Sequence, residues 1–200
     1  MVLGLHPHLD MINPRRFQRD CRFFHLNSGL ALRTWQTTPP AERWRFFCRA
    51  LLELQTREDF TSHALVLMGT HFHLLFSTHS LREHILVEDL HQILSRLCNK
   101  TWEALELPLF CDPILSAQYY KNAYKYIYRN PIEAGLCRRA EDYEYSSLHS
   151  LLGLSSHSAP VIDNMGLVQS PAKTLEWLNQ DFGEEQGSLQ ISSKPNFVFR

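Results

Sequence analysis

The chain has 200 residues, a length that suits one domain with a large core or one domain followed by a tail. Its hydrophobic content of 44% and charged content of 20% are those of an ordinary soluble globular protein, and a net charge of -1 lacks the overall basic character common among nucleic-acid-binding proteins. No run of about 18 apolar residues is present, and the first residues lack the basic start and apolar core of a signal peptide. We therefore expect neither a transmembrane helix nor a secretory signal.

The five cysteines are odd in number, widely scattered and form no CxxC pair. This pattern indicates reduced core thiols in a cytoplasmic protein. It is not the pattern of a disulfide framework or of a zinc ribbon.

Hydrophobic periodicity and turn residues predict alternating strands and helices. Two prolines precede the first predicted helix, where proline is tolerated, and Pro113 favours an edge position for its strand because proline cannot donate to a sheet ladder. Pro131 predicts that its helix ends at Asn130, since the residue before a proline disfavours helical geometry. In chain order the predicted elements are strand 22–27, helix 41–54, strands 60–68 and 71–77, helix 83–104, strand 109–115, helix 117–130 and a short helix at 175–179.

Two histidines follow directly after the short Gly69-Thr70 break between two of the predicted strands. Side chains alternate faces along a strand, so His71 and His73 point the same way and Phe72 points the other way. Two neutral imidazoles on one face can provide half of a site for a divalent cation. Equally, such histidines can be ordinary hydrogen-bonded polar residues of a strand.

The predicted helix 117–130 carries five tyrosines within ten residues, which helical spacing divides into two stripes. The apolar stripe is expected to pack inward. The polar stripe puts Tyr126 and Asn130 on one face at the end of the helix, where they can be presented to a ligand. Tyr126 can also be one more packing residue, and Asn130 can simply cap the helix. The apolar stripe contains Tyr120, Ala123, Tyr124, Ile127 and Tyr128, and the polar stripe contains Tyr119, Asn122, Tyr126 and Asn130.

Several segments, in this order, resemble the motifs of one family. Strand 22–27 sits where the single-tyrosine HUH transposases, the IS200/IS605-like superfamily, have their first YHV strand. The segment 68–75 resembles that family's MPNHxHLL strand, with Gly-Thr in place of Pro-Asn. Residues 126–136 resemble its YxxxNPVxAGL helix end, and residues 143–148 its YxWSS element. The similarity covers roughly residues 20–153 and is closest to the REP-associated branch.

The resemblance implies a ferredoxin-like α+β core, in which helices pack on an antiparallel sheet, followed by a C-terminal extension. It also implies cleavage and rejoining of single-stranded or hairpin DNA through a covalent 5′-phosphotyrosine. By position, Tyr126 matches the nucleophile, and His71 and His73 match the metal-binding pair. Asn130 matches the residue that completes the metal shell. The expected metal is Mg²⁺ or Mn²⁺, which would neutralise charge on the phosphate oxygens and favour deprotonation of the phenol.

We therefore expect a transposase-like HUH nuclease domain at residues 1–153 and an extension at 154–200 that is docked or partly disordered. The one nucleophilic tyrosine allows either a monomer or a homodimer that exchanges helices. Arg129 and Lys125 can contact phosphates or be solvated. Two other functions stay open. One is a domesticated, catalytically inactive protein that binds nucleic-acid hairpins by charge and stacking, and the other is a metal-dependent hydrolase without a covalent step.

Overall fold

A four-stranded antiparallel sheet forms the centre of the computed structural model, which describes residues 21–28, 38–98, 109–154 and 157–182. Its strands are β1 (Arg22–Ser28), β2 (Thr61–Leu67), β3 (Phe72–Thr78) and β4 (Leu109–Ile114). They lie in the order β2-β3-β1-β4, and each neighbouring pair is antiparallel. β4 is therefore an edge strand, as its proline predicted.

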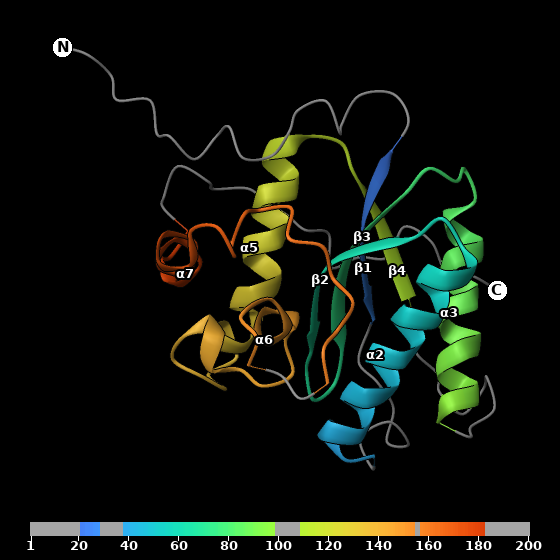
Figure 1. Ribbon diagram of the computed structural model, residues 1–200, viewed down its shortest axis with the longest axis horizontal. Helices are drawn as coiled ribbons and strands as arrows, with labels where there is room; N and C mark the ends of the chain where they lie inside the picture. Colours follow the sequence, from blue (N-terminus) through green and yellow to red (C-terminus); the bar gives the residue numbers. More distant parts are fainter. Residues whose placement is uncertain (1–20, 29–37, 99–108, 155–156, 183–200) are drawn as a thin grey trace.

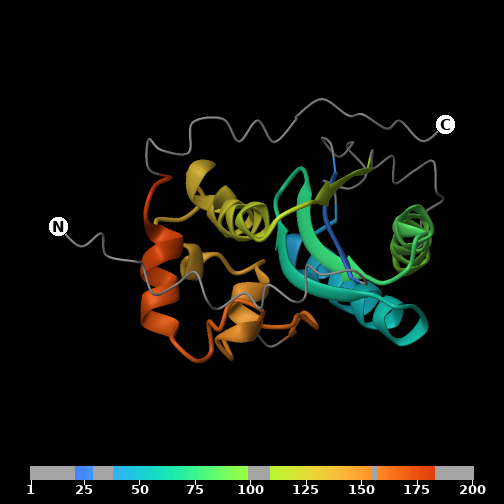
Figure 2. The same cartoon turned by 90° about the horizontal axis from the view of Figure 1, so that it is seen from above.

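Helices cover both faces of this sheet, as Figure 1 and Figure 2 show. One face carries α2 (Pro40–Arg57) and α3 (Glu83–Leu97), and the other carries α5 (Ala117–Glu133), α6 (Ser147–Leu151) and α7 (Pro171–Asn179). The order β1-α2-β2-β3-α3-β4 is the ferredoxin-like arrangement, which confirms the predicted α+β class. The second predicted helix ends at Leu97, and residues 99–104 of that prediction lie outside the described residues. None of the described helices has both the length and the apolar character that crossing a membrane requires.

Alternation along the strands builds a separate hydrophobic core on each face of the sheet. Leu74 and Phe76 of β3 belong to the core under α2 and α3. Leu75, between them, belongs to the core under α5. The apolar stripe of α5 fills this second core, and its three tyrosines, Tyr120, Tyr124 and Tyr128, are fully buried. His73 alternates with Leu74 and so faces α5, as the sequence predicted.

α5 continues for one turn beyond its predicted end at Asn130. It ends at Glu133, with Pro131 inside the helix. Proline removes one N–H from the helical ladder, but the chain beyond the helix satisfies the last carbonyls. The N–H of Gly135 bonds the carbonyl of Ile132, and the N–H that follows bonds the carbonyl of Pro131, each at 2.9 Å. Gly135 has a φ of 69°, the left-handed conformation that this helix ending requires. Asn130 therefore lies inside the helix and does not cap it.

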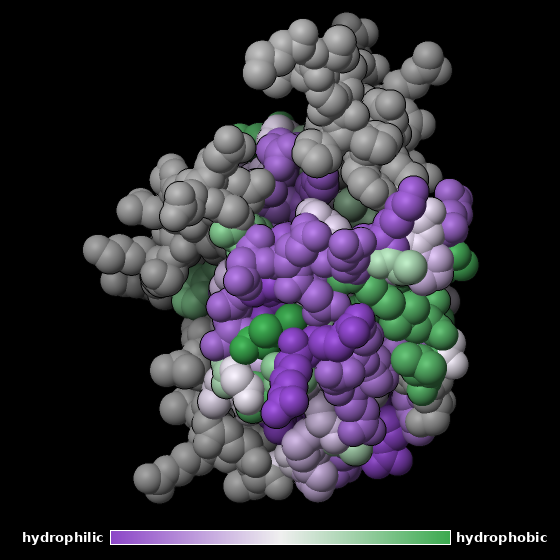
Figure 3. Space-filling model, turned by 90° about the vertical axis from the view of Figure 1, so that its left-hand side faces the viewer, coloured by the Kyte–Doolittle hydropathy of each residue, from purple (hydrophilic) through white to green (hydrophobic). Residues whose placement is uncertain are grey.

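Residues 157–182, which belong to the predicted C-terminal extension, pack against the domain. Val161 forms a parallel bridge with Ser62 of β2, and α7 lies beside α5. Figure 3 shows that this side of the molecule is mainly hydrophilic, with separate hydrophobic patches. The described part of the extension thus contacts both sides of the domain. Ala159 belongs to the core under α2 and α3, and Leu167 and Leu178 belong to the core under α5.

Candidate active site

The loop between β2 and β3 places His71 directly before the first residue of β3. Met68 donates its N–H to the carbonyl of His71 at 2.8 Å, closing a four-residue turn around the predicted Gly-Thr break. The buried Arg43 of α2 donates to the carbonyl of Gly69 at 2.8 Å. The hydroxyl of Tyr143 donates to the last carbonyl of β2 at 2.8 Å. These bonds anchor the backbone on both sides of the turn that leads into His71.

β3 places His73 beside His25 of β1. The antiparallel register pairs His25 with Leu75, so both histidines project from the sheet face that α5 covers. Their rings stack with centroids 5.2 Å apart and planes at 24°. Nε2 of His25 lies 3.1 Å from Nδ1 of His73, a hydrogen bond between two buried imidazoles.

Tyr126 projects from α5 onto this pair of imidazoles. Its ring meets the ring of His73 edge to face, with centroids 5.4 Å apart and planes at 79°. It meets the ring of His25 in the same way at 6.1 Å and 78°. His71 completes the group, because its ring centroid lies 5.1 Å from that of His73. A helix and a strand that are distant in the sequence thus bring the predicted nucleophile against the predicted histidine pair.

Asn130 lies one helical turn after Tyr126 and close to both predicted ligands. Its Nδ2 donates to the carbonyl of Tyr126 at 3.2 Å, a bond along the helix that leaves the amide oxygen for other partners. A side-chain hydrogen bond with Asn130 opposes, as the smallest contribution, the lowering of the pKa of His71 and of His73. All four predicted site residues therefore meet in one place.

Burial keeps the imidazoles of this group neutral. Complete burial lowers the pKa of His25 from 6.5 to about 4. Burial lowers the pKa of His73 well below 6.5, and repulsion from charged His25 and His71 would lower it further. Burial also lowers the pKa of His71. A neutral imidazole keeps one nitrogen lone pair, which is the form that binds a metal.

The imidazole nitrogens of His71 and His73 that are not used in hydrogen bonds suit a metal site in which some coordination positions stay available. Nδ1 of His71 lies 3.0 Å from the hydroxyl of Thr70, and Nδ1 of His73 is bonded to His25, so Nε2 is the nitrogen left for a metal in both rings. Nε2 of His73 is buried without a hydrogen-bond partner of normal length among the described residues. With the amide oxygen of Asn130, these atoms suit a divalent cation that keeps other positions for water or phosphate.

The predicted ligand set contains only two histidines and an amide. In the described ranges, no group of three or more His, Cys, Asp and Glu side chains is placed to hold a metal ion. Any cation here would therefore need oxygen ligands from water and from the substrate.

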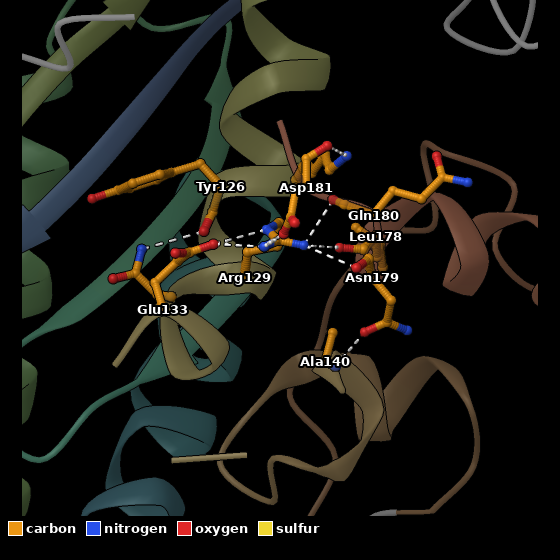
Figure 4. Close-up of polar contacts among 10 residues, drawn as sticks. Tyr126, Arg129, Glu133, Ala140, Leu178, Asn179, Gln180 and Asp181 are labelled. Atoms are coloured by element: carbon orange, nitrogen blue, oxygen red, sulfur yellow. Dashed lines mark hydrogen bonds and ion pairs between the residues drawn. The ribbon is translucent and has the colours of Figure 1, made fainter. Parts of the chain in front are cut away.

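The environment of Arg129 differs from the predicted phosphate contact or solvated cation. Arg129 is only 3% exposed. It donates to the carbonyls of Asn179 and Gln180 at 3.0 and 2.7 Å and to the carboxylate of Asp181 at 2.6 Å. Figure 4 shows the guanidinium among these groups and the ring of Tyr126 extending away from them. Arg129 therefore anchors the C-terminal segment behind the candidate site.

Lys125 has the same role and likewise differs from the prediction. It is 6% exposed, and its Nζ lies 5.5 Å from the ring centroid of Trp177 and 5.1 Å from that of Phe182. Such cation–π contacts stabilise an ammonium group that is largely removed from water. Lys125 and Arg129, which lie one helical turn apart on α5, therefore both face the C-terminal segment.

Sequence reasoning missed two residues of the site. His25 occurs at the centre of a short aromatic strand, and a histidine on the face opposite Phe24 and Leu26 is a signal for a polar contact across the sheet. Its partner depends on strand register, which the sequence does not state. Arg43 had no distinguishing signal, because it is one of several arginines in α2.

Comparisons with known proteins are sparse. No family model matches the chain, and no curated protein matches it significantly. Among solved structures, the chain is similar to a REP-associated tyrosine transposase bound to a REP hairpin, with a TM-score of 0.51 and 16% sequence identity. The superposition covers 72% of this chain and 92% of that chain. At this identity, the likeness shows that the two chains share a fold.

Proposed function

We propose that this protein is a metal-dependent single-tyrosine DNA strand transferase, which cleaves and rejoins single-stranded or hairpin DNA. One observation carries the proposal. The ring of Tyr126 lies edge to face against His73 at 5.4 Å, with Asn130 interacting with both residues of the HxH pair. A phenol, two imidazoles and an amide converge from two elements, and this is the set of groups that metal-assisted attack on a phosphodiester needs.

Tyr126 would supply the nucleophile. Its phenol oxygen forms a bond to the phosphorus of a phosphodiester, and the bond from that phosphorus to the 3′ oxygen of the preceding nucleotide breaks. The phenol proton passes to water, and the departing 3′ oxygen takes up a proton to become a hydroxyl. The resulting 5′-phosphotyrosine retains an ester bond, so attack by a 3′-hydroxyl can rejoin the DNA and release the phenol.

His71, His73 and Asn130 would hold Mg²⁺ or Mn²⁺ through two Nε2 atoms and one amide oxygen. A bound cation stabilises negative charge on the phosphate and favours ionisation of a nearby phenol, whose pKa is about 10 in free tyrosine. The lowered pKa of both histidines keeps them neutral near pH 7. They therefore suit the role of ligands better than that of proton donors.

Hairpin DNA is the substrate class that the comparison favours. The similar transposase is bound to a REP hairpin, and the shared fold supports a related ligand for this chain. The net charge of -1 supports a local binding surface over a uniformly basic one.

The test is to trap the covalent adduct. The probe is a pool of oligonucleotides that each carry one hairpin between randomised single-stranded flanks. A label at the 3′ end is required, because the fragment that stays attached through its 5′ phosphate carries that end. Wild-type protein with Mn²⁺ or Mg²⁺ should give a labelled protein band that resists denaturation. Tyr126→Phe should abolish the band, whereas Tyr124→Phe, which changes a buried tyrosine on the other stripe of α5, should keep it.

Three outcomes would overturn this assignment. An adduct of wild-type intensity in Tyr126→Phe would move the nucleophile to another residue. Salt-dependent hairpin binding by the wild type without any adduct, under either metal, would instead support the inactive hairpin-binding protein. Metal-dependent cleavage that persists in Tyr126→Phe without an adduct would support the hydrolase.

A further inference from the structure

His25 is a buried residue of the candidate site to which the proposed chemistry gives no role. It is 0% exposed on the inner strand β1, and its Nε2 lies 3.1 Å from Nδ1 of His73. Its other nitrogen, Nδ1, has no hydrogen-bond partner within the described residues, and the same is true of Nε2 of His73. The two rings are therefore bonded chiefly to each other.

A hydrogen bond between two neutral imidazoles contains one proton and allows two arrangements. In the first, His25 donates from Nε2 to Nδ1 of His73, and Nε2 of His73 then carries a proton. In the second, His73 donates from Nδ1 to Nε2 of His25, and Nε2 of His73 then has a lone pair. Only the second arrangement leaves Nε2 of His73 able to bind a cation.

We propose that His25 is a positioning residue, which accepts the Nδ1 proton of His73 and so presents the Nε2 lone pair of His73 to a divalent cation. This inference rests on the proposed function, because it takes His73 to be a ligand. Ligating histidines commonly donate their other N–H to a fixed acceptor, which sets the tautomer and the ring orientation and raises the basicity of the ligand. Here the acceptor is an imidazole where a carboxylate or a carbonyl is more usual.

The geometry around His25 fits this role. Its ring is stacked on that of His73 at 5.2 Å, and the ring of Tyr126 lies edge to face against it at 6.1 Å, so its rotation is restricted on two sides. β1 lies between β3 and β4, so His25 is on an inner strand and not at an edge of the sheet. The hydroxyl of Thr70 holds Nδ1 of His71 at 3.0 Å. Each proposed histidine ligand thus has its Nδ1 atom occupied.

The experiment measures Mn²⁺ affinity by electron paramagnetic resonance, where free Mn²⁺ gives a six-line signal that binding removes. His25→Phe keeps an aromatic ring but has no acceptor, and it should weaken Mn²⁺ binding by roughly 10- to 100-fold. His25→Gln places an amide oxygen near the position of Nε2 and should recover affinity to within a few-fold of the wild type. The control is His63→Gln, which alters a buried histidine of β2 that is bonded to Ser77 at 2.8 Å, away from the HxH pair.

Spectroscopy separates a positioning role from direct ligation. At saturating Mn²⁺, the electron spin-echo modulation from coordinated imidazole nitrogen should be unchanged in His25→Phe, because His71 and His73 still bind. In the metal-free wild type, where no cation imposes a tautomer, long-range ¹H–¹⁵N spectra should show His73 protonated at Nδ1 and unprotonated at Nε2. This second measurement needs no variant, so it decides the question even where His25→Phe does not fold.

The outcomes separate this inference from the proposed function. If the wild type shows no Mn²⁺ with coordinated imidazole, the proposed metal site fails and this inference fails with it. If the wild type binds Mn²⁺ through imidazole and His25→Phe binds it equally well, only the role of His25 is overturned. Loss of one imidazole coupling in His25→Phe would make His25 a ligand, and a proton on Nε2 of His73 would reverse the direction of the hydrogen bond. Either result also overturns the inference.

Discussion

The ring of His73 and the ring of Tyr126 meet edge to face, with centroids 5.4 Å apart, although one side chain belongs to β3 and the other to α5. The candidate site is therefore an interface between the sheet and a helix. Both halves are fixed by one shared hydrophobic core, to which Leu75 contributes from the strand and Tyr124 from the helix. Changes that loosen this packing should separate the two halves of the site before they unfold the domain.

The role of Asn130 as a ligand can be tested by removing its side-chain amide and by replacing the amide with a carboxylate. Asn130→Ala should lower Mn²⁺ affinity without a large change in the free energy of unfolding, because the side chain is only half-buried and its hydrogen bond along the helix is long, at 3.2 Å. Asn130→Asp adds a carboxylate, the harder oxygen ligand, and should raise the affinity. Titration of free Mn²⁺ by its resonance signal measures both. Equal affinity in all three proteins would remove Asn130 from the ligand set.

Arg43 offers a test of how the loop before His71 is held. Arg43→Met keeps much of the buried stem but removes the bond to the carbonyl of Gly69. We expect a loss of about 1 kcal/mol in the free energy of unfolding and a several-fold weaker affinity for Mn²⁺, since His71 follows this loop. Arg45→Met changes an exposed arginine of the same helix and is the matched control. Chemical denaturation and Mn²⁺ titration of the two variants make the comparison.

The buried His25 should make the metal-free protein less stable in acid. Its pKa is about 4 in the folded protein against 6.5 for a free side chain. Between these values the unfolded chain binds a proton that the folded chain does not, so the free energy of unfolding falls as the pH decreases. The contribution is fully present above pH 6.5 and is lost by pH 4, an effect on the order of 3 kcal/mol for this residue. His25→Gln should show a correspondingly shallower loss when denaturation is followed from pH 7 to pH 4.

Arg129 should matter for stability more than for nucleic-acid binding. Arg129→Met removes the bonds to the end of α7 and to Asp181, and we expect a loss of about 1–3 kcal/mol in the free energy of unfolding. It should also increase proteolysis in the C-terminal segment. Lys173→Met, an exposed change on α7, serves as the control. Hairpin affinity that falls in Arg129→Met without a change in stability would restore the predicted phosphate contact.

Local sequence patterns predicted much of the fold and of the candidate site. Alternation placed His71 and His73 on one face, and helical spacing separated Tyr126 from the buried tyrosine stripe. Both predictions depend on neighbours within one element, where geometry is regular. The two-sided packing then follows from the positions of the apolar residues, whereas the ferredoxin-like arrangement of the strands was implied by the family resemblance.

Contacts between distant segments were not predictable in the same way. The bond between His25 and His73 depends on the register of β1 against β3. The burial of Arg129 depends on α7 returning to α5, far along the chain. The prediction that α5 ends before Pro131 was wrong because a glycine ending four residues later satisfies the helix carbonyls. In each case the deciding partner lies outside the local pattern.

Because Arg129 anchors the end of α7, the candidate site should stay intact only while the C-terminal segment stays attached to α5. Arg129 lies on the same turn of α5 as Asn130, so an opening event that releases Asp181 removes the support from that turn. Amide hydrogens near the end of α5 should then exchange with solvent at a rate set by the detachment of α7, and not by global unfolding. In native-state hydrogen exchange, the last turns of both helices should behave as one cooperative unit.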